Sequence, residues 1–158
     1  MSVGAYLSPL GEIILAADEE GLVGLWFEGQ KYERRGLEEG LSGGEGHISA
    51  AKAWLDRYFQ GQVPALGPEL PLRPRGTDFQ KKVWARLSQI PYGQTMSYGE
   101  IARDLGGGSA RAVGSAVGKN PLSIFIPCHR VLGKNGSLTG YAGGLERKRF
   151  LLELEKST

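Results

Sequence analysis

The sequence predicts an α/β fold of the α+β kind, with a small N-terminal sheet-plus-helix domain followed by a mainly helical C-terminal domain that contains a helix-turn-helix. Residues 1–66 begin with strand-like runs and end in a helical repeat. Residues 67–76 form a proline-containing linker, and residues 77–158 carry a series of short helix signals. The chain has 158 residues, of which 41% are hydrophobic, which excludes global disorder and a large multidomain assembly.

The N-terminal part carries the signals of a β-hairpin followed by a helix. Two apolar runs, 11–17 and 22–27, flank the acidic turn 18–21, and this order is typical of paired antiparallel strands. Five glycines without periodicity between 36 and 46 predict a mobile surface loop. Apolar residues then recur at helical spacing over 48–59 and predict a helix that packs on the hairpin.

A crossover and a capped helix come next. Residues 63–75 contain four prolines and predict an extended segment. Thr77 and Gln80 form a capping-box pattern at the start of a helix that we expect to end before Pro91. The residues expected to share its apolar face are Phe79, Val83, Leu87 and Ile90.

Two further helix starts surround a glycine turn. Ser97 and Glu100 repeat the capping-box pattern for a short helix through Leu105, and Ser109 caps a helix over about 110–117. This arrangement resembles a helix-turn-helix, although an ordinary corner between two helices has the same signals. The second helix is slim because Arg111 is its only long polar side chain, so it can approach DNA closely or pack closely against another helix.

The chemical candidates follow a short apolar segment. Residues 124–126 predict a buried strand, which Pro127 ends because proline donates no N–H. A bend there is needed if the side chains of Cys128 and His129 are to meet. The stretch 105–145 holds no carboxylate and four cations, so we expect the thiol pKa to be lowered; a buried structural cysteine is the alternative. Those cations are Arg111, Lys119, Arg130 and Lys134.

A carboxylate on the C-terminal helix completes a candidate relay. Arg147, Phe150, Leu151 and Leu154 define the inner stripe of this helix, and Glu155 borders it. A carboxylate near the core needs a partner, and an imidazole is a natural one. The residues thus predict a Glu155–His129–Cys128 arrangement of orienting group, base and nucleophile.

Composition limits the function further. The single cysteine excludes an internal disulfide, and with only two histidines we expect no metal site. No apolar run approaches membrane-spanning length, and the N-terminus lacks a signal-peptide pattern, so we expect a soluble, intracellular protein. Residues 1–76 carry a net charge of −4 and residues 77–158 carry +6, so the C-terminal half suits a polyanion such as DNA.

Several ordered motifs resemble the O6-alkylguanine-DNA alkyltransferases, also called methylated-DNA–protein-cysteine methyltransferases. The resemblance covers most of 77–155, about half of the chain. The first 76 residues contain no cysteine and would match a zinc-free form of the family's N-terminal domain. The motifs are PYGQTMSYGEIA (91–102), SARAVGSAVGKNP (109–121), IPCHRV (126–131) and TGYAGGLERKRFLLELE (139–155).

The resemblance implies DNA repair by direct damage reversal, in which the protein transfers the alkyl group of O6-alkylguanine to itself once and is thereby inactivated; activity on O4-alkylthymine stays open. Cys128 would accept the alkyl group, His129 would act as base through a water, and Glu155 would orient the imidazole. Tyr98 would help to rotate the base out and donate a proton toward its N3, and Asn120 would brace the cysteine turn. The implied partner is double-stranded DNA containing O6-alkylguanine.

The resemblance also implies a DNA face and a base pocket. Arg111 would enter the base stack in place of the flipped base. The other implied DNA-binding residues are Tyr98, Ser109, Ala110, Ser115 and Arg130. The implied substrate pocket consists of Val131, Tyr141, Ala142 and Gly143. Ala142 stands where some members have Ser, so no side-chain hydroxyl is available there, although a backbone N–H could still meet O6; the departure bears on the tolerance for bulky adducts more than on the reaction. We expect a cytoplasmic monomer, nucleoid-associated in a prokaryote, with no cofactor and no membrane contact.

Two other classes of function remain as alternatives. A cysteine hydrolase or peptidase also uses Cys and His, but it needs turnover and an oxyanion hole, and it leaves the helix-turn-helix and the basic half unexplained. A non-enzymatic DNA binder is either a regulator or a damage sensor of the alkyltransferase-like type, and such sensors lack the cysteine that is present here. Transfer of one methyl group to Cys128 distinguishes these alternatives.

Overall fold

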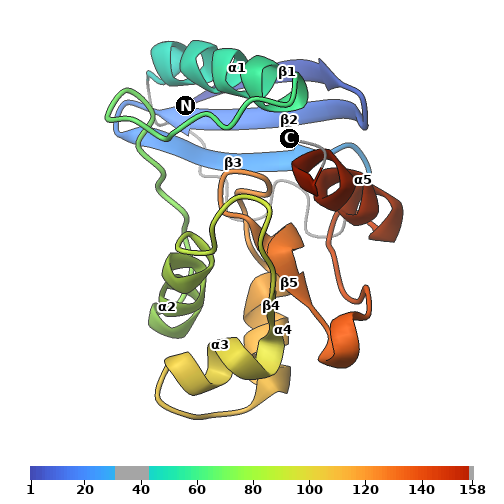
Figure 1. Ribbon diagram of the computed structural model, residues 1–158. Coiled ribbons are helices and arrows are strands. Elements are labelled where there is room, and N and C mark those ends of the chain that lie inside the picture. The colour runs from blue at the N-terminus through green and yellow to red at the C-terminus, as the bar shows by residue number, and fades with distance from the viewer. Residues whose placement is uncertain (31–42, 157–158) are drawn as a thin grey trace.

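Figure 1 shows the fold in a computed structural model that describes residues 1–30 and 43–156. Within these ranges, an antiparallel three-stranded sheet has the order β1 (Ser2–Ser8), β2 (Gly11–Asp18), β3 (Gly21–Phe27). The predicted hairpin is therefore confirmed as β2 and β3. The glycine-rich loop predicted over 36–46 lies, for 36–42, outside the described residues.

Strand β1 was not predicted from the sequence. Its apolar side chains Val3 and Leu7 are 54% and 84% exposed, so they point away from the core and give no amphipathic pattern. The strand is held instead by pairing with β2 along its length, and by Tyr6, whose ring stacks on Phe59. A strand of this kind cannot be predicted from its own residue pattern, because its pairing with a neighbouring strand determines it.

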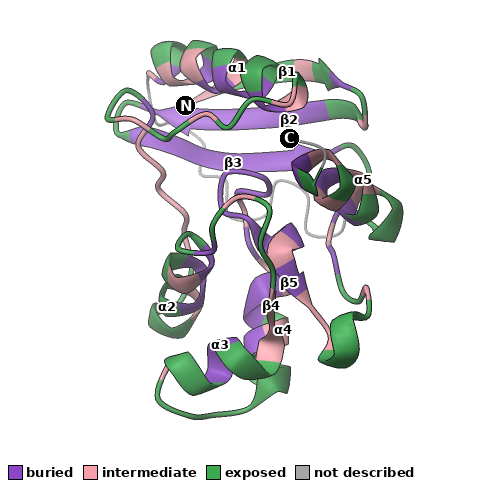
Figure 2. Cartoon of the chain, in the orientation of Figure 1, coloured by how far each residue is buried: buried purple, intermediate pink, exposed green. Residues whose placement is uncertain are grey.

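Strand β3 and most of β2 are buried on both faces of the sheet (Figure 2). Ile13 and Leu15 of β2 point into the main core, whereas Ile14 and Ala16 join a smaller cluster on the opposite face. This alternation follows from the two-residue period of a strand. Helix α1 (Glu45–Phe59), which confirms the predicted helix, covers the main-core face with its buried aromatic and aliphatic side chains (Figure 1).

The second half is mainly helical. Its elements are α2 (Asp78–Leu87), β4 (Met96–Ser97), α3 (Tyr98–Asp104), α4 (Ala110–Gly118), the 3-10 turn η1 (Cys128–Arg130), β5 (Val131–Leu132), the 3-10 turn η2 (Lys134–Gly136) and α5 (Leu145–Lys156). Both predicted capping boxes are present, at Thr77 and Ser97, and the Ser109 hydroxyl accepts the N–H of Ala112. The short parallel pair β4–β5 is separate from the N-terminal sheet.

The predicted face of α2 needs one correction. Phe79 is 44% exposed, and the buried stripe consists of Val83, Trp84 and Leu87. The Trp84 indole N–H donates to the carbonyl of Ala116 at 2.8 Å, and this contact turns Trp84 inward and Phe79 outward. It also ties α2 to α4.

The strand predicted over 124–126 is wrong. Ile124 has a φ of 73°, the Ile126 N–H donates to Leu122 O at 2.9 Å, and the segment is a buried turn. Asn120 holds this turn, because its amide donates to Ile126 O and its carbonyl oxygen accepts the Leu122 N–H. The apolar run predicts burial correctly, but side-chain bonding at Asn120 overrides the extended backbone.

The two halves share one hydrophobic core, which runs from β2 and β3 through α1 to α2, α4 and α5 (Figure 2). Isolated bridges join Leu22 to Leu72 and Leu25 to Leu122, so each half also contributes backbone contacts to the junction. These contacts do not make one continuous sheet among the described residues. The domain division at residues 67–76 stays a prediction.

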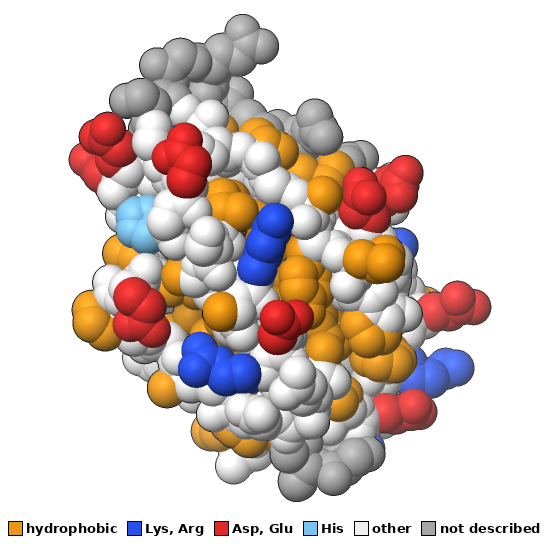
Figure 3. Space-filling model, turned by 90° about the horizontal axis from the view of Figure 1, so that it is seen from above, with side chains coloured by type: hydrophobic (Ala, Val, Ile, Leu, Met, Phe, Trp, Pro, Cys, Tyr) orange, Lys and Arg blue, Asp and Glu red, His pale blue; other side chains and the backbone are white. Residues whose placement is uncertain are grey.

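The outer face above α1 differs in charge from the basic C-terminal half. Figure 3 shows acidic side chains around the rim of this face, with hydrophobic and a few basic ones between them. In the part of the chain that the structure describes, no helix has both the length and the apolar character needed to cross a bilayer.

Candidate active site and DNA-binding face

The cysteine lies on a tight turn at the centre of the second half. Pro127 ends the buried turn held by Asn120, and η1 starts directly after it, with the Cys128 N–H donating to Ile126 O at 2.7 Å. Cys128 is 3% exposed and His129 is fully buried. The bend expected at Pro127 is therefore present, and it brings both side chains into the core.

Burial changes the expectation for the thiol. Desolvation raises the pKa of Cys128, and the neighbouring Asn120, Ser123 and Lys148 oppose this rise only in part. The predicted lowering of the pKa is therefore wrong, because loss of water around the sulfur outweighs the neighbouring hydrogen bonds and the charge of Lys148. The resting thiol is neutral, and it needs a base to become a nucleophile.

His129 and Glu155 form the predicted pair. The Nε2 of His129 lies 2.6 Å from Oε2 of Glu155, and both side chains are buried. An ionised carboxylate only accepts, so Nε2 carries the hydrogen and Nδ1 keeps a lone pair. This Nδ1 has no hydrogen-bond partner among the described residues. Burial lowers the pKa of His129, and Glu155 opposes the effect, so a neutral imidazole is available as a base.

Glu155 is the centre of a larger polar cluster. Its oxygens also accept from the Tyr58 hydroxyl at 2.7 Å, the Gly93 N–H at 3.2 Å and the guanidinium of Arg130. Burial raises the pKa of Glu155, but the bonds from His129 and Arg130 lower it more and hold it well below its usual range. Sequence patterns gave no signal for Tyr58, which lies on the buried stripe of α1 and looks like an ordinary core aromatic.

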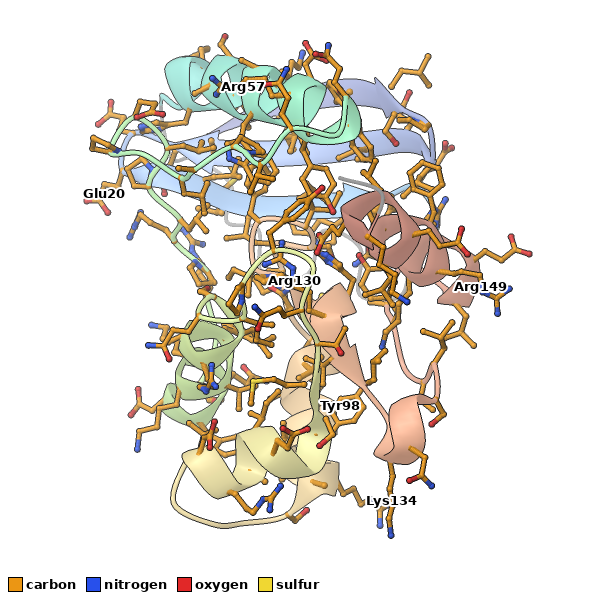
Figure 4. The ribbon with its side chains drawn as sticks, in the orientation of Figure 1. Glu20, Arg57, Tyr98, Arg130, Lys134 and Arg149 are labelled. Atoms are coloured by element: carbon orange, nitrogen blue, oxygen red, sulfur yellow. The ribbon has the colours of Figure 1, made fainter. Side chains whose placement is uncertain are left out.

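Arg130 has a different position from the one expected of a DNA contact. Its Nε lies 2.7 Å from Oε1 of Glu155, its Nη1 donates to Ile90 O at 2.7 Å, and its side chain is 11% exposed. The guanidinium lies 5.5 Å from the Tyr92 ring centroid. Figure 4 shows Arg130 beneath β3, in the interior of the molecule and away from the α3–α4 end. The buried carboxylate accounts for this inward orientation.

Lys148 is a second residue that sequence reasoning missed. It is fully buried on α5, and its ammonium donates to Val131 O at 2.5 Å and Thr139 O at 2.7 Å. Burial lowers its pKa to about 8. Lys148 lies three residues before Leu151 and so on the same inward face of the helix. A cation at such a position is the signal that could have identified it. It ties β5 to the segment that precedes the predicted base pocket.

The predicted pocket residues lie in or next to the two segments that Lys148 joins. Val131 and Tyr141 are buried, Ala142 is partly buried, and Gly143 fits closely because a Cβ there would lie 2.7 Å from the Phe27 ring. The Tyr141 hydroxyl is buried without a hydrogen-bond partner among the described residues. The Tyr98 hydroxyl donates to Thr139 O at 3.2 Å and so reaches the same segment from α3.

The predicted DNA face lies on α4. Ser109, Ala110, Arg111 and Ser115 are all exposed, although the Ser109 hydroxyl is engaged in capping the helix. Tyr98 lies between this face and the pocket, since a Cβ on Gly114 of α4 would lie 3.7 Å from its ring (Figure 4). Within residues 1–30 and 43–156, no cluster of three or more metal-ligating side chains is present.

A buried cysteine that directly precedes the histidine of a buried His–Glu pair, in a half that also carries two short helices joined by a glycine turn, is the arrangement expected of a DNA-binding protein with a nucleophilic cysteine. Residues 1–74 match the ribonuclease-like domain of 6-O-methylguanine DNA methyltransferase, and residues 78–157 match its DNA binding domain. The chain belongs to this methyltransferase family.

Individual relatives agree with the family match. The methylated-DNA–protein-cysteine methyltransferase of Methanosarcina acetivorans is 46% identical over 99% of both chains. That of Mycobacterium bovis is 50% identical over 95% of this chain and 89% of the relative. The crystal structure of Mycobacterium tuberculosis OGT in complex with DNA has a TM-score of 0.85 and 46% identity, covering 97% of this chain and 91% of that one.

Proposed function

We propose that Cys128 is the acceptor in a single-turnover repair reaction. As a member of this family the protein is a DNA-repair transferase, which moves the alkyl group of O6-alkylguanine in DNA to a cysteine. One observation carries the assignment to Cys128: the single cysteine in the sequence directly precedes His129 of the His129–Glu155 pair.

The reaction needs one bond exchange and balanced proton transfer. The sulfur of Cys128 attacks the alkyl carbon, a carbon–sulfur bond forms, and the bond between that carbon and O6 of guanine breaks. A bridging water passes the thiol proton to Nδ1 of His129, and Glu155 stabilises the imidazolium. Tyr98 donates a proton to N3 of the departing guanine and recovers one from His129 through solvent. The thioether product has no simple route back to thiol, so each molecule reacts once.

The DNA contacts follow the exposed face of α4. Arg111 fills the space of the flipped base, and Ser109, Ala110 and Ser115 line the approach to the backbone. Tyr98 stands at the junction of this face with the pocket formed by Val131, Tyr141, Ala142 and Gly143. Asn120 keeps the cysteine turn in shape. The protein works as a cytoplasmic monomer, nucleoid-associated in a prokaryote.

Intact mass spectrometry tests the proposal directly. After incubation with duplex containing O6-methylguanine, the protein gains one methyl group, and peptide mapping places it on Cys128. Cys128→Ser loses the transfer and keeps its affinity for DNA, because the thiol supplies chemistry and little binding surface. Duplex with unmodified guanine serves as the control. Repeated product release, or methylation of Cys128→Ser, would disprove the assignment and favour another class of activity.

A further inference from the structure

One contact links the N-terminal half to the reaction centre. The hydroxyl of Tyr58 on α1 donates to Oε2 of Glu155 on α5 at 2.7 Å, across 97 residues of sequence. Tyr58 is 1% exposed, and the Glu155 side chain is equally buried. A hydrogen bond to a buried carboxylate is charge-assisted and stronger than an ordinary one. The N-terminal half therefore contributes a polar atom to the active site.

The ring of Tyr58 is held from three sides. It stacks on Trp54, with centroids 5.3 Å apart and an interplanar angle of 11°, and it meets Phe59 and Tyr92 edge-on. Because these contacts fix the ring, they also fix the direction of its hydroxyl. The hydroxyl cannot follow Glu155 if the carboxylate turns, so it restrains the carboxylate.

The two oxygens of Glu155 have different partners. Oε1 accepts from Arg130 Nε and from the Gly93 N–H. Oε2 accepts from His129 Nε2 and the Tyr58 hydroxyl, and from Arg130 Nη2 at the longer distance of 3.1 Å. The Tyr58 hydroxyl and the imidazole of His129 therefore bind the same oxygen of Glu155.

We propose that Tyr58 is a positioning residue for alkyl transfer, which aligns Oε2 of Glu155 with His129 and moderates the negative charge that the imidazole meets. This inference rests on the proposed function, since it assigns Tyr58 to the same reaction. It gives the N-terminal half a role in the chemistry in addition to its role in the core.

The charged and titratable groups around the pair define what Tyr58 changes. Arg130 faces both His129 and Glu155, Lys148 of α5 lies near both the imidazole and the Cys128 thiol, and Tyr141 lies near Tyr58 and Glu155. All of these remain when the Tyr58 hydroxyl is removed. Glu155 then becomes a stronger acceptor for His129, and the pKa of the imidazolium rises. A larger fraction of His129 is protonated at a given pH and cannot take the thiol proton.

Tyr58→Phe tests this with the aromatic packing preserved. Methyl-transfer rates with O6-methylguanine duplex would be measured across the acid limb of the pH profile. We expect the plateau rate to fall at least about fivefold, because one hydrogen bond to a charged group is lost. We expect the acid limb of the profile to move up by roughly half a pH unit. Tyr6→Phe is the matched control, because the Tyr6 hydroxyl donates to the carboxylate of Asp56 at the same 2.7 Å and not to Glu155. It keeps the wild-type profile.

A second substitution acts in the opposite direction. Site-specific 3-fluorotyrosine at position 58 keeps the hydroxyl and makes it a stronger donor, so we expect the acid limb to move to lower pH. Imidazole ¹⁵N NMR reports His129 directly, with His47 as the internal reference because the chain has only two histidines. This measurement needs no activity and applies to each folded variant.

The outcomes separate this inference from the proposed function. If the wild type transfers no methyl group to Cys128, the proposed function fails. If the wild type transfers it, but Tyr58→Phe and the fluorotyrosine protein both keep the wild-type pH profile and His129 resonances, Tyr58 is only a packing residue and the inference is overturned. Opposite shifts in the two proteins, with unchanged DNA affinity, support it.

Discussion

Glu155 accepts five hydrogen bonds from four described residues, and this number explains how a carboxylate can lie in the core. Each donor stabilises the ionised form, and together they offset the cost of burial. Its helical position predicted the pairing with His129, because a carboxylate that borders an apolar stripe needs a partner. The donors from Tyr58 and Gly93 come from other parts of the chain, so no local pattern could predict them.

The same bonds predict how stability depends on pH. The pKa of Glu155 is lowered in the folded state from 4.5, so its contribution is present above that value and is lost as pH falls below it. Glu155→Gln lowers the free energy of unfolding by about 3 kcal/mol at neutral pH, because it leaves Arg130 without its charge partner. Below about pH 4.5 the wild type loses stability more steeply than the variant.

Urea unfolding between neutral and acid pH measures this difference. Glu153→Gln, an exposed position on the same helix, is the control and keeps the slope of the wild type. His129 also favours its neutral form when buried, so both proteins retain some loss of stability in acid. Parallel curves for wild type and Glu155→Gln would show that the carboxylate is not the group responsible.

At the scale of elements, signals within a few residues predicted the structure well. The capping boxes at Thr77 and Ser97 and the cap at Ser109 depend on contacts three residues apart, and all three are confirmed. The segment 124–126 failed because the side chain of Asn120, outside the segment, sets its backbone. Strand β1 was not predicted, because its exposed side chains include its most apolar ones. Contacts within a few residues are readable from sequence, and so is the partner that a buried carboxylate requires, such as His129 for Glu155; contacts set by the packing of distant segments are not.

Helix α4 yields a prediction about DNA binding. Its exposed residues are small apart from Arg111, so Arg111 alone can reach deep between bases. Arg111→Ala lowers both affinity for O6-methylguanine duplex and the rate of methyl transfer by at least about tenfold, because the vacated stack stays unfilled and flipping costs a few kcal/mol. Fluorescence anisotropy and single-turnover kinetics measure the two effects.

Arg149→Ala provides the charge-matched control. Arg149 is exposed on α5, on a different side of the molecule from α4 (Figure 4), and the variant loses the same single charge. We expect it to bind and react nearly as the wild type does, with a slightly changed salt dependence. Equal losses in the two variants would mean that Arg111 acts only through net charge, and the intercalating role would have to be abandoned.

At the scale of the whole molecule, charge is divided between two halves while the core is shared. Residues 77–158 carry a net charge of +6, which attracts the phosphates of DNA. Residues 1–76 carry a net charge of −4, which the phosphates repel. The core cluster nevertheless continues from the sheet into α2, α4 and α5. The composition of each half was readable from the sequence, but the continuity of the core was not, because it depends on how the halves pack.

A shared core predicts that the molecule unfolds as one unit. Leu25 is fully buried in β3, and its N–H donates to Pro121 O at 2.8 Å, so it joins the sheet to the turn that precedes the cysteine. Leu25→Ala lowers the free energy of unfolding by about 2–5 kcal/mol, the range for a buried leucine. Leu7→Ala, at a side chain that is 84% exposed, changes it by less than about 0.5 kcal/mol. In every variant, tryptophan fluorescence and far-UV circular dichroism should give coincident urea transitions. Separate transitions, with Leu25→Ala shifting only one of them, would instead establish two independently stable domains, as the predicted linker at residues 67–76 implies.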